Sequence, residues 1–166
     1  AHAVHPIAAV QSEYSLWTRD PEDGILETCK ELGVAFVPYS PLGRGFLTGK
    51  IRSVDDMAAD DFRRTSQPRF ERANLQKNLA MVDTLTALAE SKGCTPAQLA
   101  LAWVLAQGDH VIPIPGTRTE RYVDENIAAA ALSLTADDIS ALDQIAPKGT
   151  INGERYTVEG MQHVDK

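Results

Sequence analysis

Three residues in the stretch from Val111 to Asn126 have the types and spacing expected of a phosphate-binding site. Gly116 has no Cβ to hold a ligand away from the backbone, and Arg118 and Arg121 add positive charges that suit phosphate oxygens. A helix that starts among them would add free backbone N–H groups and the positive end of its dipole. The stretch therefore indicates an anion site, although a crossover helix with solvated arginines explains the same residues.

A strand, a tight turn and a helix must position these residues. The β-branched run from Val111 to Ile114 predicts a short buried strand that ends at Pro115. Thr117, followed three residues later by Glu120, is a capping box, which predicts a helix that begins near Arg118.

A second predicted strand, Val34 to Pro38, leads into a loop rich in glycine that extends from Tyr39 to Lys50. The loop fits neither a P-loop nor a G-x-G-x-x-G motif, because the spacing between its glycines and from them to the lysine is wrong. Its backbone N–H groups, with Ser40 and Arg44 nearby, could still surround a pyrophosphate as an anion nest. The alternative is a turn-rich loop whose glycines serve geometry only.

Two side chains at predicted strand ends could contact other parts of a ligand. Gln11, after the apolar run Ile7 to Val10, carries both a donor and an acceptor and could pair with a carboxamide. Tyr39 could stack on a flat heteroaromatic ring, or it could be an ordinary half-buried tyrosine. The carboxyl ends of parallel strands are where α/β folds place their ligands, so function is expected at this rim.

Composition restricts the class of protein. The 166 residues form one ordinary domain by length, and 43% are hydrophobic, which is enough for a core. A net charge of −7 with interspersed signs argues against binding to nucleic acid or anionic membranes. Cys29 and Cys94 belong to no C-x-x-C pair, which fits a reducing cytoplasm, and His2 and His5 lack a third metal ligand. No apolar run has transmembrane length and no signal peptide is expected.

The remaining pattern completes three strand-helix units in succession, which is typical of a parallel α/β sheet. Helices are expected from Asp20-Pro21 to Gly33, from Leu75 to Gly93, from a capping box at Thr95 to Gln107, and from Thr135 to Pro147. Ile51 to Ala73 is predicted to be a long loop, and the tail from Lys148 to Lys166 shows no periodicity. An open doubly wound sheet and a (β/α)8 barrel both fit these units, and three strands are less than half a barrel.

Taken together, the motifs resemble the aldo-keto reductase family, and in particular its branch of pyridoxal reductase-like enzymes. The resemblance spans nearly the whole chain and rests on Gln11-Ser12-Glu13-Tyr14-Ser15, the run Tyr39 to Lys50, Thr95 to Trp103, and Pro113 to Asn126. It implies an α/β fold, the (β/α)8 TIM barrel, of which this chain supplies the last three strand-helix units and the C-terminal tail. Residues 1–166 would then be the C-terminal, cofactor-binding part of one barrel domain whose N-terminal part is absent.

The resemblance also implies NADP(H) as cofactor. Gln11 would hold the nicotinamide carboxamide and Tyr39 would stack on the ring. The pyrophosphate would lie against Ser40, Pro41, Leu42, Gly43, Arg44 and Lys50. The adenosine half would lie against Gly116, Thr117, Arg118, Tyr122, Glu125 and Asn126, with Arg118 at the 2′-phosphate and Arg121 in support. Relatives often carry Gln or Arg where this chain has Tyr122. The loop from Ile51 to Phe70 would close over the dinucleotide, with Arg69 as a clamp.

By the same resemblance, the intact protein would reduce a small aldehyde or ketone to an alcohol. The family's catalytic tetrad of Asp, Tyr, Lys and His lies outside the motifs present here, so no catalytic residue is assigned to Tyr14, Tyr39, Lys50 or His110. The chain alone is expected to be inactive and to need the N-terminal half of its barrel, or self-association, for stability. Two alternatives are a redox-sensing module that binds NADP(H) and acts on a protein partner, and an unrelated doubly wound nucleotide binder.

Overall fold

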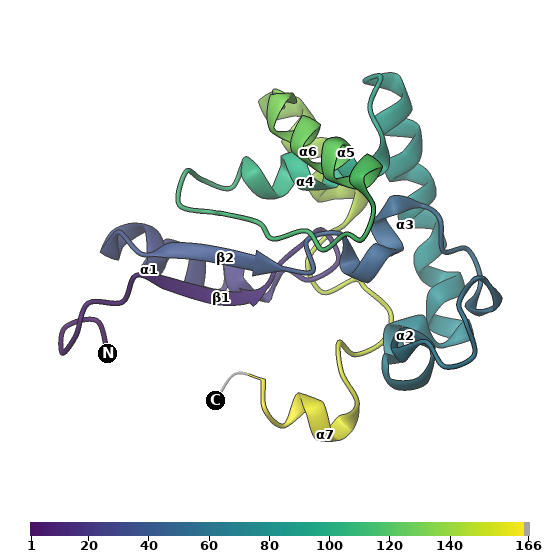
Figure 1. Cartoon of the computed structure of the whole chain (residues 1–166), viewed down its shortest axis with the longest axis horizontal. Helices are drawn as coiled ribbons and strands as arrows, with labels where there is room; N and C mark the ends of the chain where they lie inside the picture. The colour runs from purple at the N-terminus through teal and green to yellow at the C-terminus, as the bar shows by residue number, and fades with distance from the viewer. Residues whose placement is uncertain (165–166) are drawn as a thin grey trace.

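Three extended segments run in the same direction through the centre of the fold (Figure 1). The computed structural model describes residues 1–164, and the last two residues of the predicted tail lie outside this range. Strands β1 (Ala9–Glu13) and β2 (Ala35–Tyr39) pair in parallel, with Ala9 opposite Ala35 and Glu13 opposite Tyr39. Residues 111–114 pair with the other edge of β2 through two isolated parallel bridges. The parallel α/β arrangement expected from the sequence is therefore present.

The third segment was predicted as a strand, but it forms only the bridges of Val111 with Phe36 and of Ile114 with Tyr39. Phe36 N–H donates to the carbonyl of residue 110, and the N–H of Ile112 donates back to the carbonyl of Phe36 at 2.8 Å. The next bond of a parallel ladder would come from the N–H of residue 38, and Pro38 has none. The ladder is interrupted at that point. The other two strands lie one to three residues later than predicted.

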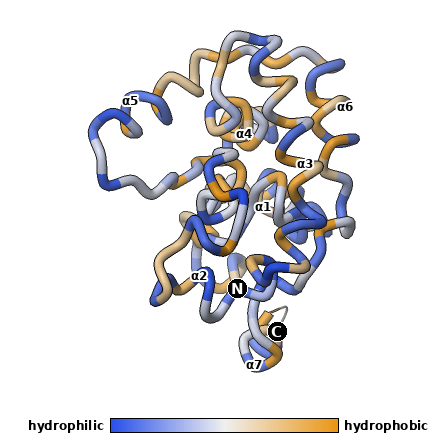
Figure 2. The backbone as a smooth tube through the Cα atoms, turned by 90° about the vertical axis from the view of Figure 1, so that its right-hand side faces the viewer, coloured by the Kyte–Doolittle hydropathy of each residue, from blue (hydrophilic) through white to orange (hydrophobic). Residues whose placement is uncertain are grey.

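Helices and the loops between them form the rest of the structure. Helix α1 lies behind the sheet in the view of Figure 1. Their bounds are α1 Ile25–Leu32, α2 Phe62–Ser66, α3 Arg72–Ser91, α4 Pro96–Leu105, α5 Glu120–Ala128, α6 Ala136–Ile145 and α7 Val158–Met161. Short 3-10 helices span Asp20–Glu22, Gly43–Thr48, Val54–Asp56, Pro68–Phe70 and Ala129–Ala131. Figure 2 shows the largely hydrophobic α4 in the middle of the helical layer, and most of its residues are buried.

Two of the four helix starts that were predicted from capping residues are confirmed. Thr95 and Thr135 each form a capping box, in which the threonine hydroxyl accepts from the backbone three residues later and that residue's side chain bonds back. The third start is wrong, because Asp20-Pro21 opens only a 3-10 turn and α1 begins after Gly24, whose φ of 101° interrupts the helix. The fourth is also wrong: Thr117 bonds the backbone of Thr119 instead, and α5 begins at Glu120.

An aromatic stack fixes the loop that follows β2. The rings of Trp17 and Phe46 are stacked with centroids 4.2 Å apart, and Phe70 meets Trp17 edge-on at 5.1 Å. All three side chains are buried. Because the three residues come from the connection after β1, the glycine-rich loop and the following long loop, their packing holds these segments together.

The tail is ordered by polar contacts, although the sequence predicted no regular structure in it. It contains α7, which lies below the sheet in Figure 1. The buried side chain of Asn78 in α3 donates to the carbonyl of Asn152 at 3.0 Å and accepts from its N–H at 2.9 Å. Arg155 pairs with Asp20 at 3.2 Å. The long loop predicted from Ile51 to Ala73 likewise contains α2 and two 3-10 helices.

Among the described residues, no helix combines the length and the hydrophobicity required to cross a bilayer.

We expect Asn78→Ala to release the tail, because the N–H and carbonyl of Asn152 lose their partners inside the structure. Two such bonds stabilise the docked tail by about 2 kcal/mol, so trypsin should cleave after Arg155 at least about tenfold faster than in the wild type. The exposed neighbour Gln76→Ala is the matched control and should leave the rate unchanged. Equal cleavage rates for Asn78→Ala and the wild type would contradict this role for Asn78.

Candidate functional site

A pocket of about 850 Å³ opens beside the carboxyl ends of β2 and the third extended segment. Its walls come from the glycine-rich loop, from residues 114–126 and from α2. Most of the residues predicted to bind a dinucleotide line this pocket: Ser40, Pro41, Leu42, Arg44, Lys50, Gly116, Thr117, Arg118, Tyr122, Glu125 and Asn126. Two predicted clusters separated by about seventy residues in the sequence therefore share one cavity, which is large enough for an organic ligand.

The other three predicted residues lie nearby. Gln11 and Tyr39 line an adjoining cavity of about 440 Å³, whose remaining wall comes from the C-terminal tail. Gly43 is buried, and a Cβ built on it would lie 2.8 Å from Cε3 of Trp17. A glycine at position 43 therefore allows the loop to approach Trp17 closely. At Gly116, in contrast, the space that a Cβ would occupy is open.

The loop wall of the pocket contains backbone strain. Ser40 and Arg44 have φ angles of 50° and 55°, in the left-handed region that side chains other than glycine adopt at a cost of about 1 kcal/mol each. Such strain persists only where surrounding contacts impose it, and it clusters at binding sites. Here the imposed contacts are visible, because the Arg44 guanidinium donates to the buried Glu13 carboxylate at 2.8 Å.

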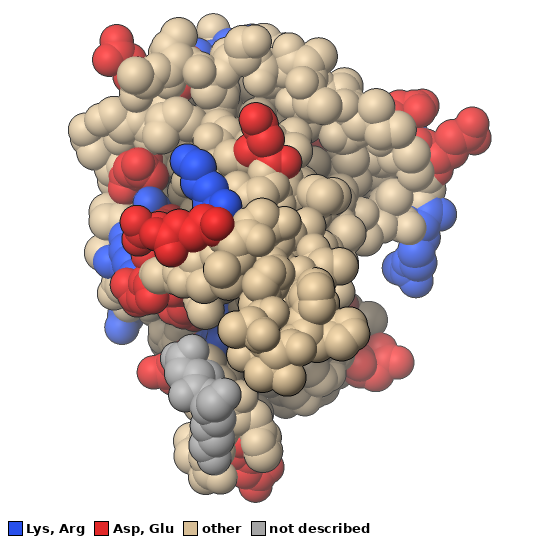
Figure 3. Space-filling model, turned by 90° about the vertical axis from the view of Figure 1, so that its left-hand side faces the viewer, with Lys and Arg blue, Asp and Glu red and all other residues tan. Residues whose placement is uncertain are grey.

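Positive side chains outnumber negative ones around the pocket. Arg44, Lys50, Arg63 and Arg118 line it together with a single carboxylate, Glu125. Arg44 is neutralised by Glu13 and Arg63 by Asp61, whereas Lys50 donates to a neutral phenol and Arg118 is exposed. Charged side chains are distributed differently on the face of the molecule in Figure 3. There, acidic and basic side chains are interspersed around a mainly uncharged centre. In a chain of net charge −7, a pocket with excess positive charge favours an anionic ligand.

Lys50 connects the two walls of the pocket. Its ammonium group donates to the hydroxyl of Tyr122 at 2.7 Å and lies 4.1 Å from the centre of that ring. Lys50 belongs to the loop after β2 and Tyr122 to α5, so the contact crosses the pocket. A negatively charged ligand would offer Lys50 a stronger partner than a phenol does.

The positive residue that the long loop contributes to the pocket is Arg63, which the sequence interpretation missed. The predicted clamp, Arg69, is instead half-buried and donates to the carbonyl of Trp17 and the hydroxyl of Thr18, both at 2.6 Å, and partial desolvation lowers its pKa. Arg63 donates to the carbonyl of Arg44 at 2.9 Å. The signal was present in the sequence, because Asp61 caps α2 and thereby orients the second residue after it.

Three of the groups that were not assigned catalytic roles make contacts outside the larger pocket. The Tyr14 hydroxyl donates to Glu22 at 2.9 Å, and burial raises its pKa. Burial and a hydrogen bond with Tyr156 likewise raise the pKa of Tyr39. His110 lies just before the third extended segment, at the end of the sheet opposite the pocket, and its ring bonds the carbonyl of Leu26.

A parallel α/β fold with a positively charged pocket at the carboxyl ends of its strands is an arrangement found among oxidoreductases and other nucleotide-binding proteins. Comparison with known proteins narrows the class. Residues 1–147 match the model of the Aldo/keto reductase family, so the chain belongs to this family of oxidoreductases. The resemblance drawn from the sequence is thereby confirmed, while its pyridoxal reductase-like branch stays a prediction.

Individual relatives agree. The chain is 47% identical to the "Probable aldo-keto reductase 1" of Glycine max over 98% of its own length and 46% of that protein. It is also 47% identical to the "Aldo-keto reductase str7" of Strobilurus tenacellus, over 99% of its length and 50% of that protein. The chain thus spans about half the length of the curated relatives it matches.

Solved structures support the same barrel family. The glycerol dehydrogenase from Gluconobacter oxydans superposes with a TM-score of 0.81 at 32% identity, over 91% of this chain and 46% of that one. A thermostable aldo-keto reductase solved with the inhibitor epalrestat superposes with a TM-score of 0.60 at 29% identity, over 84% of this chain and 40% of that one. The fold described here therefore corresponds to part of an aldo-keto reductase TIM barrel.

We expect Gly43→Ala, but not Gly116→Ala, to lower the stability of the protein, because only position 43 is closely packed. Gly43→Ala should destabilise the protein by about 2 kcal/mol, because its Cβ meets Trp17 and its φ of 55° is unfavourable for alanine. Gly116→Ala, with nothing within 4 Å, should stay within about 0.5 kcal/mol of the wild type. Thermal midpoints measured at one protein concentration test the pair. Equal midpoints would show that Gly43 does not serve packing.

Proposed function

We propose that this chain holds NADP(H) in the 850 Å³ pocket and that the whole protein reduces an aldehyde or ketone to an alcohol. When bound, the dinucleotide would supply the hydride for the carbonyl carbon. The observation that carries the proposal is the convergence of the strained loop after β2 and the Gly116 turn on one positively charged cavity. Membership of a family whose members typically bind NADP(H) supports it.

Different residues around the pocket would contact different parts of the dinucleotide. Gln11 and Tyr39, in the adjoining cavity, would receive the nicotinamide carboxamide and ring. The loop from Ser40 to Lys50 would hold the pyrophosphate, since its strained backbone and positive side chains face the pocket. Arg63 in α2 would add a further charge from the side that covers the pocket.

Arg118 is the residue we infer to select NADP(H) over NAD(H). It lines the pocket beyond Gly116, where the adenosine half would lie, and a guanidinium compensates the charge of a 2′-phosphate. Tyr122, Glu125 and Asn126 lie on the same wall and would receive the adenosine. The Glu125 carboxylate is held by the Thr95 hydroxyl at 2.8 Å, which fixes this wall to the start of α4.

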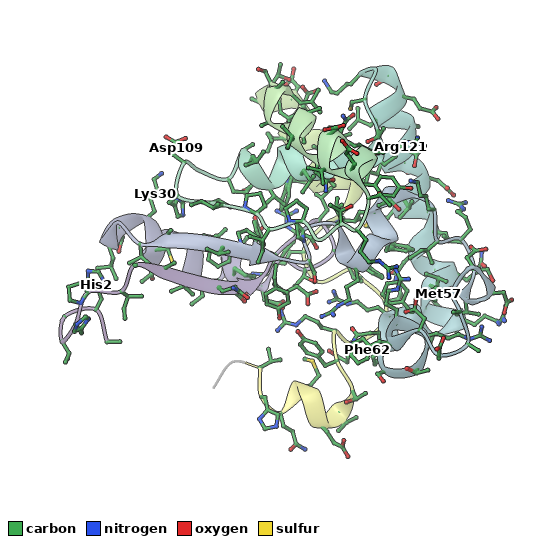
Figure 4. The ribbon with its side chains drawn as sticks, in the orientation of Figure 1. His2, Lys30, Met57, Phe62, Asp109 and Arg121 are labelled. Atoms are coloured by element: carbon green, nitrogen blue, oxygen red, sulfur yellow. The ribbon has the colours of Figure 1, made fainter. Side chains whose placement is uncertain are left out.

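Titration with NADPH and NADH, followed by the fluorescence of the reduced nicotinamide, tests this proposal. We expect NADPH to bind at least about tenfold more tightly than NADH, and Arg118→Met to abolish most of that preference without weakening NADH. Arg121→Met is the matched control. The resemblance implied that Arg121 supports Arg118, but Arg121, labelled on α5 in Figure 4, is exposed and does not line the pocket with Arg118. Absence of binding by either dinucleotide would overturn the proposed function, and an equal loss in both variants would overturn the assignment of Arg118.

We further infer that the sheet needs more strands than this chain provides. Ile112 and Ile114 are 54% and 44% exposed in the third segment, and within residues 1–164 β1 pairs only with β2, which leaves its outer edge open. Further strands of the same barrel would cover both edges, and a second copy of this chain is the other candidate. The catalytic groups would come with those strands, so we propose that these 166 residues alone do not reduce carbonyl compounds.

We expect the isolated chain to lack a cooperative urea transition as a monomer, because its apolar sheet edges remain exposed. Light scattering at each protein concentration would establish whether the sample is monomeric or self-associated. A matched NADPH oxidation assay with a small aldehyde would test inactivity. A cooperative transition in a sample shown to be monomeric would refute the need for a partner, and turnover by the chain alone would refute the proposed source of the catalytic groups.

A further inference from the structure

Tyr156, in the C-terminal tail, contacts two residues of the dinucleotide site at once. Its hydroxyl lies 2.6 Å from the hydroxyl of Tyr39 and accepts from the Arg44 guanidinium at 3.4 Å. The same guanidinium lies 5.5 Å from the centre of the Tyr156 ring. Tyr39 is the proposed platform for the nicotinamide ring and Arg44 lines the proposed pyrophosphate site. One tail side chain therefore joins the two ends of the nicotinamide half of the site.

The direction of these hydrogen bonds follows from Glu13. This buried carboxylate accepts from the Tyr156 hydroxyl at 3.4 Å, so the proton of Tyr156 points toward Glu13. Each phenol has a single proton, and Tyr39 must therefore donate to Tyr156. The hydrogen-bonded series from Tyr39 through Tyr156 to Glu13 holds the hydroxyl at the edge of the Tyr39 ring and thereby fixes the rotation of that ring. Because that contact is at the edge, it leaves the flat face of Tyr39 available for stacking.

The tail holds Tyr156 firmly in this place. Arg155 pairs with Asp20, and its guanidinium lies 5.2 Å from the centre of the Tyr156 ring. Arg155 belongs to the tail, whereas Arg44, which also lies near this ring, belongs to the loop after β2. Asn152 is bound by Asn78, as described above, and Arg69 donates to the carbonyl of Gly153 at 3.2 Å. Anchors on both α3 and the connection after β1 thus set the position from which Tyr156 reaches the site.

On these contacts we propose that Tyr156 is a positioning residue for the nicotinamide and pyrophosphate half of the dinucleotide, acting through Tyr39 and Arg44. The inference rests on the proposed function. It assigns to the tail a role in holding the cofactor, distinct from any contact with the carbonyl substrate. The adenosine half lies against Gly116 to Asn126, on a wall that Tyr156 does not contact, so its binding should not depend on the tail.

The test compares two ligands across two variants and a control. NADPH spans the whole site, whereas adenosine 2′-monophosphate lacks both phosphates of the pyrophosphate and occupies only the adenosine half. Tyr156→Phe removes the hydroxyl and keeps the ring, and we expect it to weaken NADPH binding about fivefold. Tyr156→Leu also removes the ring that lies beside Arg44 and should weaken NADPH further. Affinity for adenosine 2′-monophosphate should stay unchanged in both. Val158→Ala, at an 82% exposed tail position, should bind both ligands like the wild type.

The outcomes separate the inference from the function on which it rests. If the wild type binds neither ligand, the proposed function fails. If it binds both and Tyr156→Phe binds NADPH as tightly as the wild type, the positioning role is wrong. Equal weakening of both ligands would show a general structural effect and would also overturn it. Selective loss of NADPH affinity, in the order wild type, Tyr156→Phe, Tyr156→Leu, supports the role.

Discussion

The buried carboxylate of Glu13 is the group on which the geometry of the site depends. It ends β1 and accepts hydrogen bonds from Thr18, from Arg44 and from Tyr156. A charge this deeply buried is tolerated only when it is paired and hydrogen-bonded, so removing any partner would leave an unfavourable group in the interior. The three partners belong to the connection after β1, the loop after β2 and the tail. Satisfying one carboxylate therefore holds three separate segments at the same place.

Two contacts explain the backbone strain in the loop after β2. Arg44 adopts a left-handed backbone conformation, and its guanidinium is held by Glu13. On the other side of the loop, the stack of Trp17 and Phe46 requires a glycine at position 43. An ion pair and an aromatic stack thus fix the two sides of the loop, and the backbone between them takes the conformation that remains. That conformation turns the loop toward the pocket.

The sequence predicted features that depend on local chemistry and failed where distant contacts decide. The capping boxes at Thr95 and Thr135 were recognisable because cap and helix lie within four residues. The box at Thr117 looked the same but did not form, which shows that spacing alone is not sufficient. Asp61 offered a local signal for the orientation of Arg63, but the half-buried place of Arg69 depends on the fold of the long loop and had no such signal. The tail offered no periodicity at all, because its order comes from polar contacts with α3 and β1 and not from an apolar face.

The proposed cofactor pocket and the outer edge of β1 lie in different parts of this fold. Residues of one continuous stretch, from Ser40 to Asn126, line the whole of the larger pocket, and none comes from the open edge of β1. Ile112, which does not line that pocket and is 54% exposed, instead marks the edge where further strands would join. A site built entirely on consecutive strand-helix units can be assembled before the sheet is closed. The Tyr39 hydroxyl, in contrast, is held by the tail through Tyr156, so the proposed nicotinamide half of the site would require the chain to be folded to its C-terminal segment.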